Sequence, residues 1–128
     1  MRLLMDTCAF YWWDRGTGFT GAARRAVEDP ANETFVSAVS AWELVTKWRS
    51  GKQPEFGALA SNFVKVIEAH GFNTLAISVE HALHAASLPM HHRDPFDRML
   101  IAQSLMANMP IITPDTVFDQ YGVARIWR

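Results

Sequence analysis

Short apolar runs alternate with amphipathic segments along this chain. Runs rich in apolar and β-branched residues predict five strands: Arg2–Met5, Thr34–Ser37, Phe72–Ile77, Ile111–Thr113 and, at a sheet edge, Val123–Trp127. Helical spacing and capping residues predict the helices between them: Cys8–Trp13, Ala22–Glu28, Ala41–Arg49, Phe56–Ala69, a short one from Val79 to about Leu88, and Pro95–Met106. The alternation predicts an α/β fold, a three-layer sandwich whose central, mostly parallel sheet is flanked by helices.

The last long helix has the best-defined start in the sequence. Asp94 stands where an N-cap belongs, and Pro95 occupies the first helical position, where its missing N–H costs nothing. Asp97 then falls in the first turn, near the positive end of the helix dipole. Taken alone, the pattern is equally well explained as simple helix punctuation.

Length and composition favour one globular domain covering residues 1–128. Of these residues 49% are hydrophobic and 20% charged, which is not the composition of a disordered chain. The net charge of -1 gives no overall attraction to nucleic acid. Any contact with RNA or DNA must therefore come from a local patch or through a bound metal ion.

Cys8 is the only cysteine, which excludes an internal disulfide and a cysteine-rich zinc site. We expect it to pack as a small apolar residue. The apolar run at the N-terminus is too short for a signal peptide, and no stretch approaches the ~18 uncharged residues of a membrane span. The sequence therefore predicts a cytoplasmic protein without a membrane anchor.

Other acids follow the predicted strands. Asp6 ends the first, Asp115 comes just after the fourth, and Glu43 lies early in the helix after the second, for which Ser40 is the candidate N-cap. Each has an ordinary explanation: Asp6 as a helix cap, Glu43 as the partner of Lys47 four residues on, Asp115 as a turn residue. Because the carboxyl ends of parallel strands share one edge, however, these acids and Asp97 are also expected to meet in one pocket.

Carboxylates held within a few ångströms of each other repel, so they take up protons or bind cations. Oxygen-only ligation favours hard ions such as Mg²⁺ or Mn²⁺, which bridge to phosphate oxygens. Phosphodiester hydrolysis needs this arrangement, because the metal activates a water and clamps the scissile phosphate.

Four stretches together resemble the PIN-domain ribonucleases, specifically the VapC-type toxins of bacterial type II toxin–antitoxin systems. They are Leu3–Thr7, Ser37–Glu43, His91–Gln103 and Ile112–Asp115. The thirteen-residue run from His91 to Gln103, in this order with the others, is the most specific of them.

The resemblance implies a Mg²⁺-dependent endoribonuclease in which the acids correspond to Asp6, Glu43, Asp97 and Asp115. It further implies that the hydroxyls of Thr7 and Thr113 orient water or phosphate, and that Asp94 is either a helix cap or a direct metal ligand. Members of the family form homodimers and bind a cognate antitoxin that blocks the acidic pocket. One departure from the family pattern is Pro114, where many relatives carry a polar or charged residue.

Two other functions remain open from the sequence. One is a catalytically silent PIN-fold module that binds RNA or a partner protein. The other is a phosphatase with an aspartyl nucleophile, although Cys8 stands where that chemistry commonly places a second acid. A zinc site at His81, His84, His91 and His92 is disfavoured, because the acids suit a harder ion.

The cations beside the acids are also open to two explanations. Lys47, Arg93 and Arg98 either contact an RNA backbone or pair with neighbouring carboxylates, and the second explanation is slightly favoured.

Overall fold

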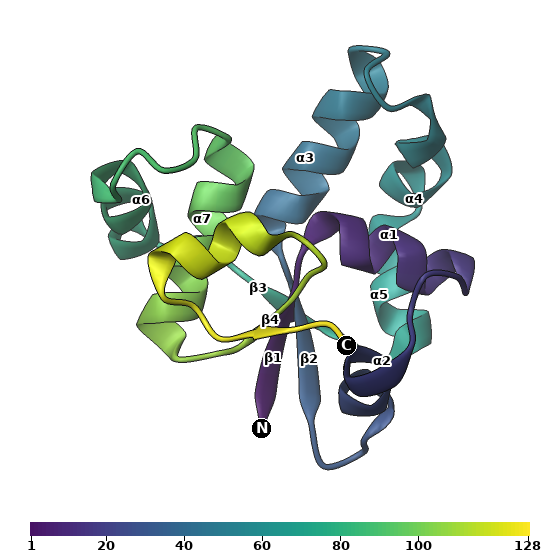
Figure 1. Cartoon of the computed structure of the whole chain (residues 1–128). Coiled ribbons are helices and arrows are strands. Elements are labelled where there is room, and N and C mark those ends of the chain that lie inside the picture. The colour runs from purple at the N-terminus through teal and green to yellow at the C-terminus, as the bar shows by residue number, and fades with distance from the viewer.

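A five-stranded sheet forms the centre of the computed structural model, which describes residues 1–128 (Figure 1). Its strands are β1 (Arg2–Met5), β2 (Glu33–Ser37), β3 (Asn73–Leu75), β4 (Ile111–Ile112) and β5 (Arg125–Ile126). They are all parallel and lie in the order β3-β2-β1-β4-β5. The structure confirms the predicted parallel sheet, with the last strand at an edge.

Helices cover both faces of the sheet (Figure 1). They are α1 (Thr7–Arg15), α2 (Gly21–Glu28), α3 (Ala38–Arg49), α4 (Gly57–Ser61), α5 (Phe63–His70), α6 (Val79–Ser87) and α7 (Pro95–Ala107), with 3-10 turns η1 (Pro54–Phe56) and η2 (Thr116–Tyr121). Helices α1, α2, α4 and α5 lie on one side, and α6, α7 and η2 on the other. Each helix is too short or too polar to cross a membrane.

The central strand β1 is buried on both faces. Leu3 and Met5 pack into a cluster with Phe10 of α1, whereas Leu4, between them, packs into a second cluster with Leu100 of α7. All five side chains are fully buried. Two helical layers are therefore joined through one strand, which explains why β1 is almost entirely apolar.

Helix α3 begins three residues before the predicted start. Strand β2 passes into it without a loop, and Ser37 caps it by accepting a hydrogen bond from the backbone N–H of Val39 at 3.1 Å. The predicted cap, Ser40, instead lies inside the helix, fully buried. Serine is a favoured N-cap residue, so the local sequence allows either position. Ser37 is the cap because β2 ends there and the helix follows directly.

The helix predicted from Phe56 to Ala69 is broken in two. Asn62 leaves the helical conformation, with φ -125° and ψ 23°, and its side-chain amide donates to the carbonyl of Ala58 at 2.9 Å. This side chain competes with the helical backbone for a hydrogen bond, as asparagine often does. The apolar side chains of both pieces still face the core. The predicted helical spacing of these residues is therefore confirmed, whereas the prediction of one continuous helix was wrong.

Arg98 on α7 ties down the segment that leads into its own helix. The buried guanidinium donates to the carbonyls of Pro89, at 2.9 Å, and His92, at 3.1 Å, through Nη1. Through Nη2 it donates to the carbonyls of Ala85, at 2.9 Å, and Leu88, at 2.8 Å, with a longer bond to Ala86. Both explanations offered for Arg98, an RNA contact and an ion pair, were therefore wrong.

We expect Arg98→Met to lower the free energy of unfolding by about 3 kcal/mol, because it leaves several buried carbonyls without donors. Urea unfolding measures this loss as a lower midpoint at an unchanged slope. Arg93→Met is the matched control, since Arg93 is exposed and has no ion pair. Equal effects of the two substitutions would contradict the anchoring role.

Candidate metal centre

Three of the predicted acids meet at the carboxyl edge of the sheet. Asp6 follows β1, Glu43 lies on α3 and Asp97 on the first turn of α7. They are close enough that the charges of Glu43 and Asp97 raise the pKa of Asp6, and the charge of Glu43 raises that of Asp97. The three segments are far apart in the sequence, so the parallel sheet brings these carboxylates together as predicted.

Asp6 is held in place by the fold on both carboxylate oxygens. Its Oδ1 accepts from the backbone N–H of Ala9 at 2.7 Å, which confirms Asp6 as the cap of α1, and its Oδ2 accepts from the hydroxyl of Thr113 at 2.7 Å. The side chain is buried, and burial is the main reason that its pKa rises to about 7. The two hydrogen bonds oppose this rise without cancelling it.

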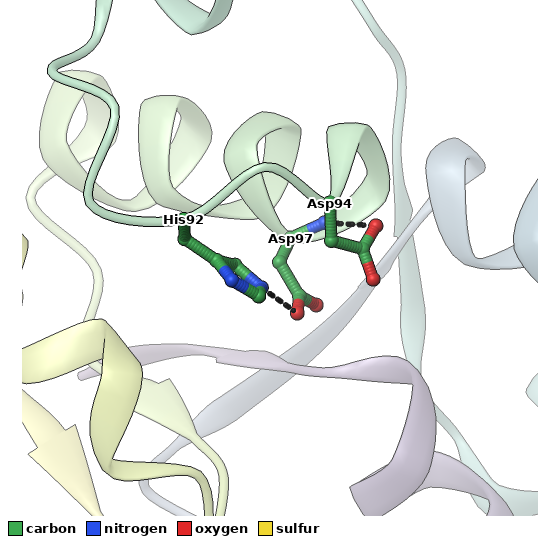
Figure 2. A group of neighbouring side chains, drawn as sticks. All are labelled: His92, Asp94 and Asp97. Atoms are coloured by element: carbon green, nitrogen blue, oxygen red, sulfur yellow. Dashed lines mark hydrogen bonds and ion pairs between the residues drawn. The ribbon is translucent and has the colours of Figure 1, made fainter.

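Asp97 is joined to a histidine that the sequence analysis did not assign to the acidic site (Figure 2). His92 Nε2 forms a hydrogen bond of 2.8 Å with Asp97 Oδ2. Burial raises the pKa of Asp97 to about 6, the bond to His92 lowers it, and the charges of Asp94 and Glu43 raise it further. One ligand atom from each of His92, Asp94 and Asp97 lies within 4.8 Å of the others.

Tyr121 fixes the backbone of His92. The tyrosine hydroxyl accepts from the backbone N–H of His92 at 2.8 Å and donates to the carbonyl of Pro89 at 2.7 Å. The only sequence signal for His92 was its place two residues before Asp94. The contact with Tyr121 spans 29 positions of the chain, so local pattern did not reveal it.

Asp94 acts as the predicted helix cap. Its Oδ1 accepts from the backbone N–H of Phe96 at 2.8 Å and, less closely, from that of Asp97. Its carboxylate nevertheless lies beside Asp97, as Figure 2 shows. Capping and proximity to the acidic site are therefore compatible at this residue.

Glu43 is 3% exposed and forms the predicted ion pair with Lys47, one turn later on α3. Burial alone would lower the pKa of Lys47, but the hydrogen bond and charge of Glu43, with the charge of Asp94, raise it instead. Only Oε2 takes part in the pair. The other oxygen, Oε1, is buried with no hydrogen-bond partner, which is costly unless a cation or water meets it.

The two predicted hydroxyl groups are already occupied within the protein. Thr113 donates to Asp6 and accepts from the backbone N–H of Asp115 at 3.1 Å, and the hydroxyls of Thr7 and Ser40 lie 2.9 Å apart. All three hydroxyl residues are buried. Thr113 therefore positions a carboxylate, and Thr7 joins α1 to α3.

The carboxylate of Asp115 has a local role at the start of η2, so its membership of the acidic cluster stays a prediction. Its exposed carboxylate caps η2 by accepting from the backbone N–H of Val117 at 3.0 Å. Its charge is not among the main causes of the raised pKa values of Asp6 and Asp97. The link from Asp115 to the site is its backbone, through Thr113.

Cys8 is exposed and does not pack in the core as predicted. Desolvation, followed by the charges of Asp6 and Glu43, raises the pKa of its thiol to about 12. The group is therefore a neutral thiol at physiological pH, without the low pKa of a reactive cysteine.

The profile of the PIN domain family matches residues 3–124 of the chain. A comparison of this chain with curated protein sequences found no match. Among solved structures, VapBC2 from Rickettsia felis, bound to a DNA fragment from its promoter, is similar with a TM-score of 0.68 and 11% identity, covering 100% of both chains.

Two further structures share the fold at low identity. VapBC-1 from nontypeable Haemophilus influenzae has a TM-score of 0.60 and 19% identity over 98% of this chain and 97% of that one. VapBC-5 from Mycobacterium tuberculosis, a member of the VapBC family of toxin-antitoxin systems, has a TM-score of 0.61 and 17% identity over 99% of this chain and 98% of that one. From the family match over nearly its whole length, with this fold and acidic edge, we conclude that the chain belongs to the PIN domain family.

Proposed function

We propose that this protein is a Mg²⁺- or Mn²⁺-dependent endoribonuclease, acting as the VapC-type toxin of a type II toxin–antitoxin system. The observation that carries the proposal is the group formed by buried Asp6, buried Glu43 and half-buried Asp97 in a PIN domain. The similarity in fold to VapBC toxin–antitoxin complexes supports it.

The residues present fit a divalent cation. The buried Oε1 of Glu43 has no partner, and Oδ1 of Asp97 is left free by the bond of His92 to Oδ2. Asp6 and Asp97 have pKa values raised towards neutrality, as expected for carboxylates short of positive charge. In the proposal these three residues hold the ion, with Asp94 beside them and Asp115 as an acid at the rim.

When bound, the ion supplies Lewis acidity at the scissile phosphate and lowers the pKa of an attacking water. The chain's own residues prepare the carboxylates for it. Thr113 and the backbone of Ala9 fix the orientation of Asp6, His92 fixes that of Asp97, and Lys47 balances one negative charge at Glu43. Such fixed geometry avoids reorganisation during the reaction.

A cognate antitoxin and a second copy of the chain are the proposed protein partners. Exposed aromatic side chains support this: Trp42 on α3 is 60% exposed, and Trp12 on α1 and Trp48 on α3 are also exposed. Trp42 stacks edge-on against Phe96, next to Asp97, with ring centroids 5.0 Å apart. In the proposal, a protein that covers Trp42 and Phe96 buries apolar surface and closes the acidic site at the same time.

We expect the purified protein to cleave RNA in the presence of Mg²⁺ or Mn²⁺ and to lose this activity when EDTA removes the ion. Asp97→Asn should reduce the rate about 100-fold or more, because it removes a charge needed to hold the ion. Asp29→Asn is the matched control, since this exposed Asp caps a turn before β2. A gel assay on labelled RNA measures both, and undiminished cleavage in EDTA would contradict the mechanism.

The same assay ranks the acids. Asp115→Asn keeps an acceptor for the backbone N–H of Val117 and removes only the charge, so it isolates the electrostatic role of an exposed group. We expect a smaller loss of rate than for Asp97→Asn. An equal loss would show that Asp115 moves into the site when RNA or metal binds. Metal-dependent RNA binding by the wild type without cleavage would favour the silent binding module.

Stability should depend on pH in a direction set by Asp6 and Asp97. Their folded-state pKa values, about 7 and about 6, lie above the reference value of 3.8 that applies to the unfolded chain. Between the reference pKa and the raised pKa of each group, the folded state therefore binds more protons than the unfolded state. Without divalent ions, the melting temperature should therefore fall as pH rises from about 4 to 7. Mn²⁺ should restore stability at pH 8 and have little effect at pH 5.

Scanning fluorimetry over this range measures the dependence. Asp6→Asn removes the titrating group with the larger rise in pKa and should flatten the profile, whereas Asp29→Asn should leave it unchanged. A wild-type melting temperature that rises from pH 5 to 7 in EDTA would show that these carboxyls are not destabilised by burial.

A further inference from the structure

A cavity of about 650 Å³ opens beside the acidic edge, between the start of η2 and the end of β5. Its walls include Pro114, Thr116, Arg125, Trp127 and Arg128. None of the acids discussed above lines it. A volume of this size lies within the range of pockets that hold small molecules, and it accommodates a nucleotide.

Three walls of this cavity carry hydrogen-bond donors that the fold does not use. The hydroxyl of Thr116, the indole N–H of Trp127 and the guanidinium of Arg128 make no hydrogen bond or ion pair within the chain. Unused donors around one cavity, one of them cationic, suit a ligand rich in acceptors and negative charge. Phosphate, ribose and nucleobase edges have this chemistry.

Arg125 and Trp127 give the cavity two rigid walls. Arg125 donates to Asp119 through Nε at 2.9 Å and to the carbonyl of Thr113 through Nη1 at 3.3 Å, so it shapes the cavity while its charge is already balanced. The ring of Trp127 is held edge-on by Phe19, with centroids 4.8 Å apart. A fixed, half-buried aromatic ring is a suitable platform for stacking a base.

The sheet places this cavity within reach of the carboxylates. Strands β1, β4 and β5 are parallel neighbours, and Asp6, Thr113 and Trp127 directly follow their ends. Two strand spacings separate the first from the last, about 10 Å. The chain itself connects the two places, since Thr113 binds Asp6 and the next residue, Pro114, lines the cavity.

We propose that this cavity is a subsite for an RNA nucleotide that neighbours the scissile phosphate. Arg128 and Thr116 bind its phosphate or ribose, and Trp127 stacks on its base. The inference rests on the proposed ribonuclease function and adds to it a second recognition site outside the acidic cluster. A protein segment is a poorer match, because it meets the charge of Arg128 only where it carries an acidic side chain, whereas every RNA nucleotide carries a phosphate.

The test compares Arg128→Gln with Arg2→Gln, an exposed arginine at the amino end of the central strand β1, away from the carboxyl ends that carry the acids. On single-stranded RNA, Arg128→Gln should raise KM about fivefold to tenfold and lower the salt dependence of binding by about one phosphate contact, with kcat unchanged. Trp127→Phe keeps an aromatic ring at the contact with Phe19 and should weaken binding without loss of stability.

Shortening the RNA locates the subsite. Removing nucleotides from one side of the cleaved bond should raise KM in the wild type, and Arg128→Gln should abolish that difference. Equal KM values for Arg128→Gln and Arg2→Gln on every RNA length would overturn the proposal, as would a loss on Arg128→Gln that is the same for substrates shortened on either side.

Binding of RNA to the Asp97→Asn protein separates this inference from the proposed function. If the wild type cleaves RNA but binding does not depend on Arg128, the subsite is wrong and the nuclease stands. If the wild type does not cleave RNA while binding still depends on Arg128 and Trp127, the nuclease proposal fails and the cavity remains a nucleotide site. Displacement of RNA by a protein partner alone, without Arg128 dependence, would reject the subsite.

Discussion

The constraint on which the site depends is the convergence of three like charges at one edge of a parallel sheet, where Asp6 and Glu43 are buried and Asp97 is half-buried. Burial of a carboxylate is costly unless hydrogen bonds or cations compensate, and here compensation is incomplete. Asp6 has two hydrogen bonds and still has a raised pKa, while Glu43 and Asp97 each use one oxygen for a partner and leave the other without one. The fold thus tolerates an unfavourable electrostatic arrangement in which carboxylate oxygens stay available as acceptors, which is typical of a functional site.

The acids are not held by their own helices alone. Tyr121 of η2 fixes the backbone of His92, His92 bonds Asp97, and Arg98 binds the segment between α6 and α7 from one turn into α7. This network joins η2 and the segment after α6 to the first turn of the helix that carries Asp97. A change at Tyr121, which touches no acid, would therefore move the carboxylate through His92.

Where a feature depends on near neighbours in the sequence, the sequence predicted it. The apolar strand β1, the start of α7 at Asp94 and Pro95, and the pair of Glu43 with Lys47 all follow from local rules, and the structure confirms them. The true cap of α3, the break at Asn62 and the roles of Arg98 and His92 were missed. The roles of Arg98 and His92 depend on hydrogen-bond partners that the tertiary structure supplies, such as the carbonyls that accept from Arg98. The cap of α3 and the break at Asn62 depend on a choice between local conformations that the surrounding fold makes.

Overall charge and local charge lead to different conclusions about RNA. The net charge of -1 neither attracts nor repels a polyanion strongly. A phosphate that enters the acidic edge nevertheless meets Asp6, Glu43, Asp94 and Asp97, opposed by Lys47 and His92. Under the proposed function, a divalent ion must reverse this local repulsion before the phosphate can approach. The ion is then required for binding at the scissile phosphate as well as for chemistry, whereas the proposed subsite at Arg128 would attract RNA without it.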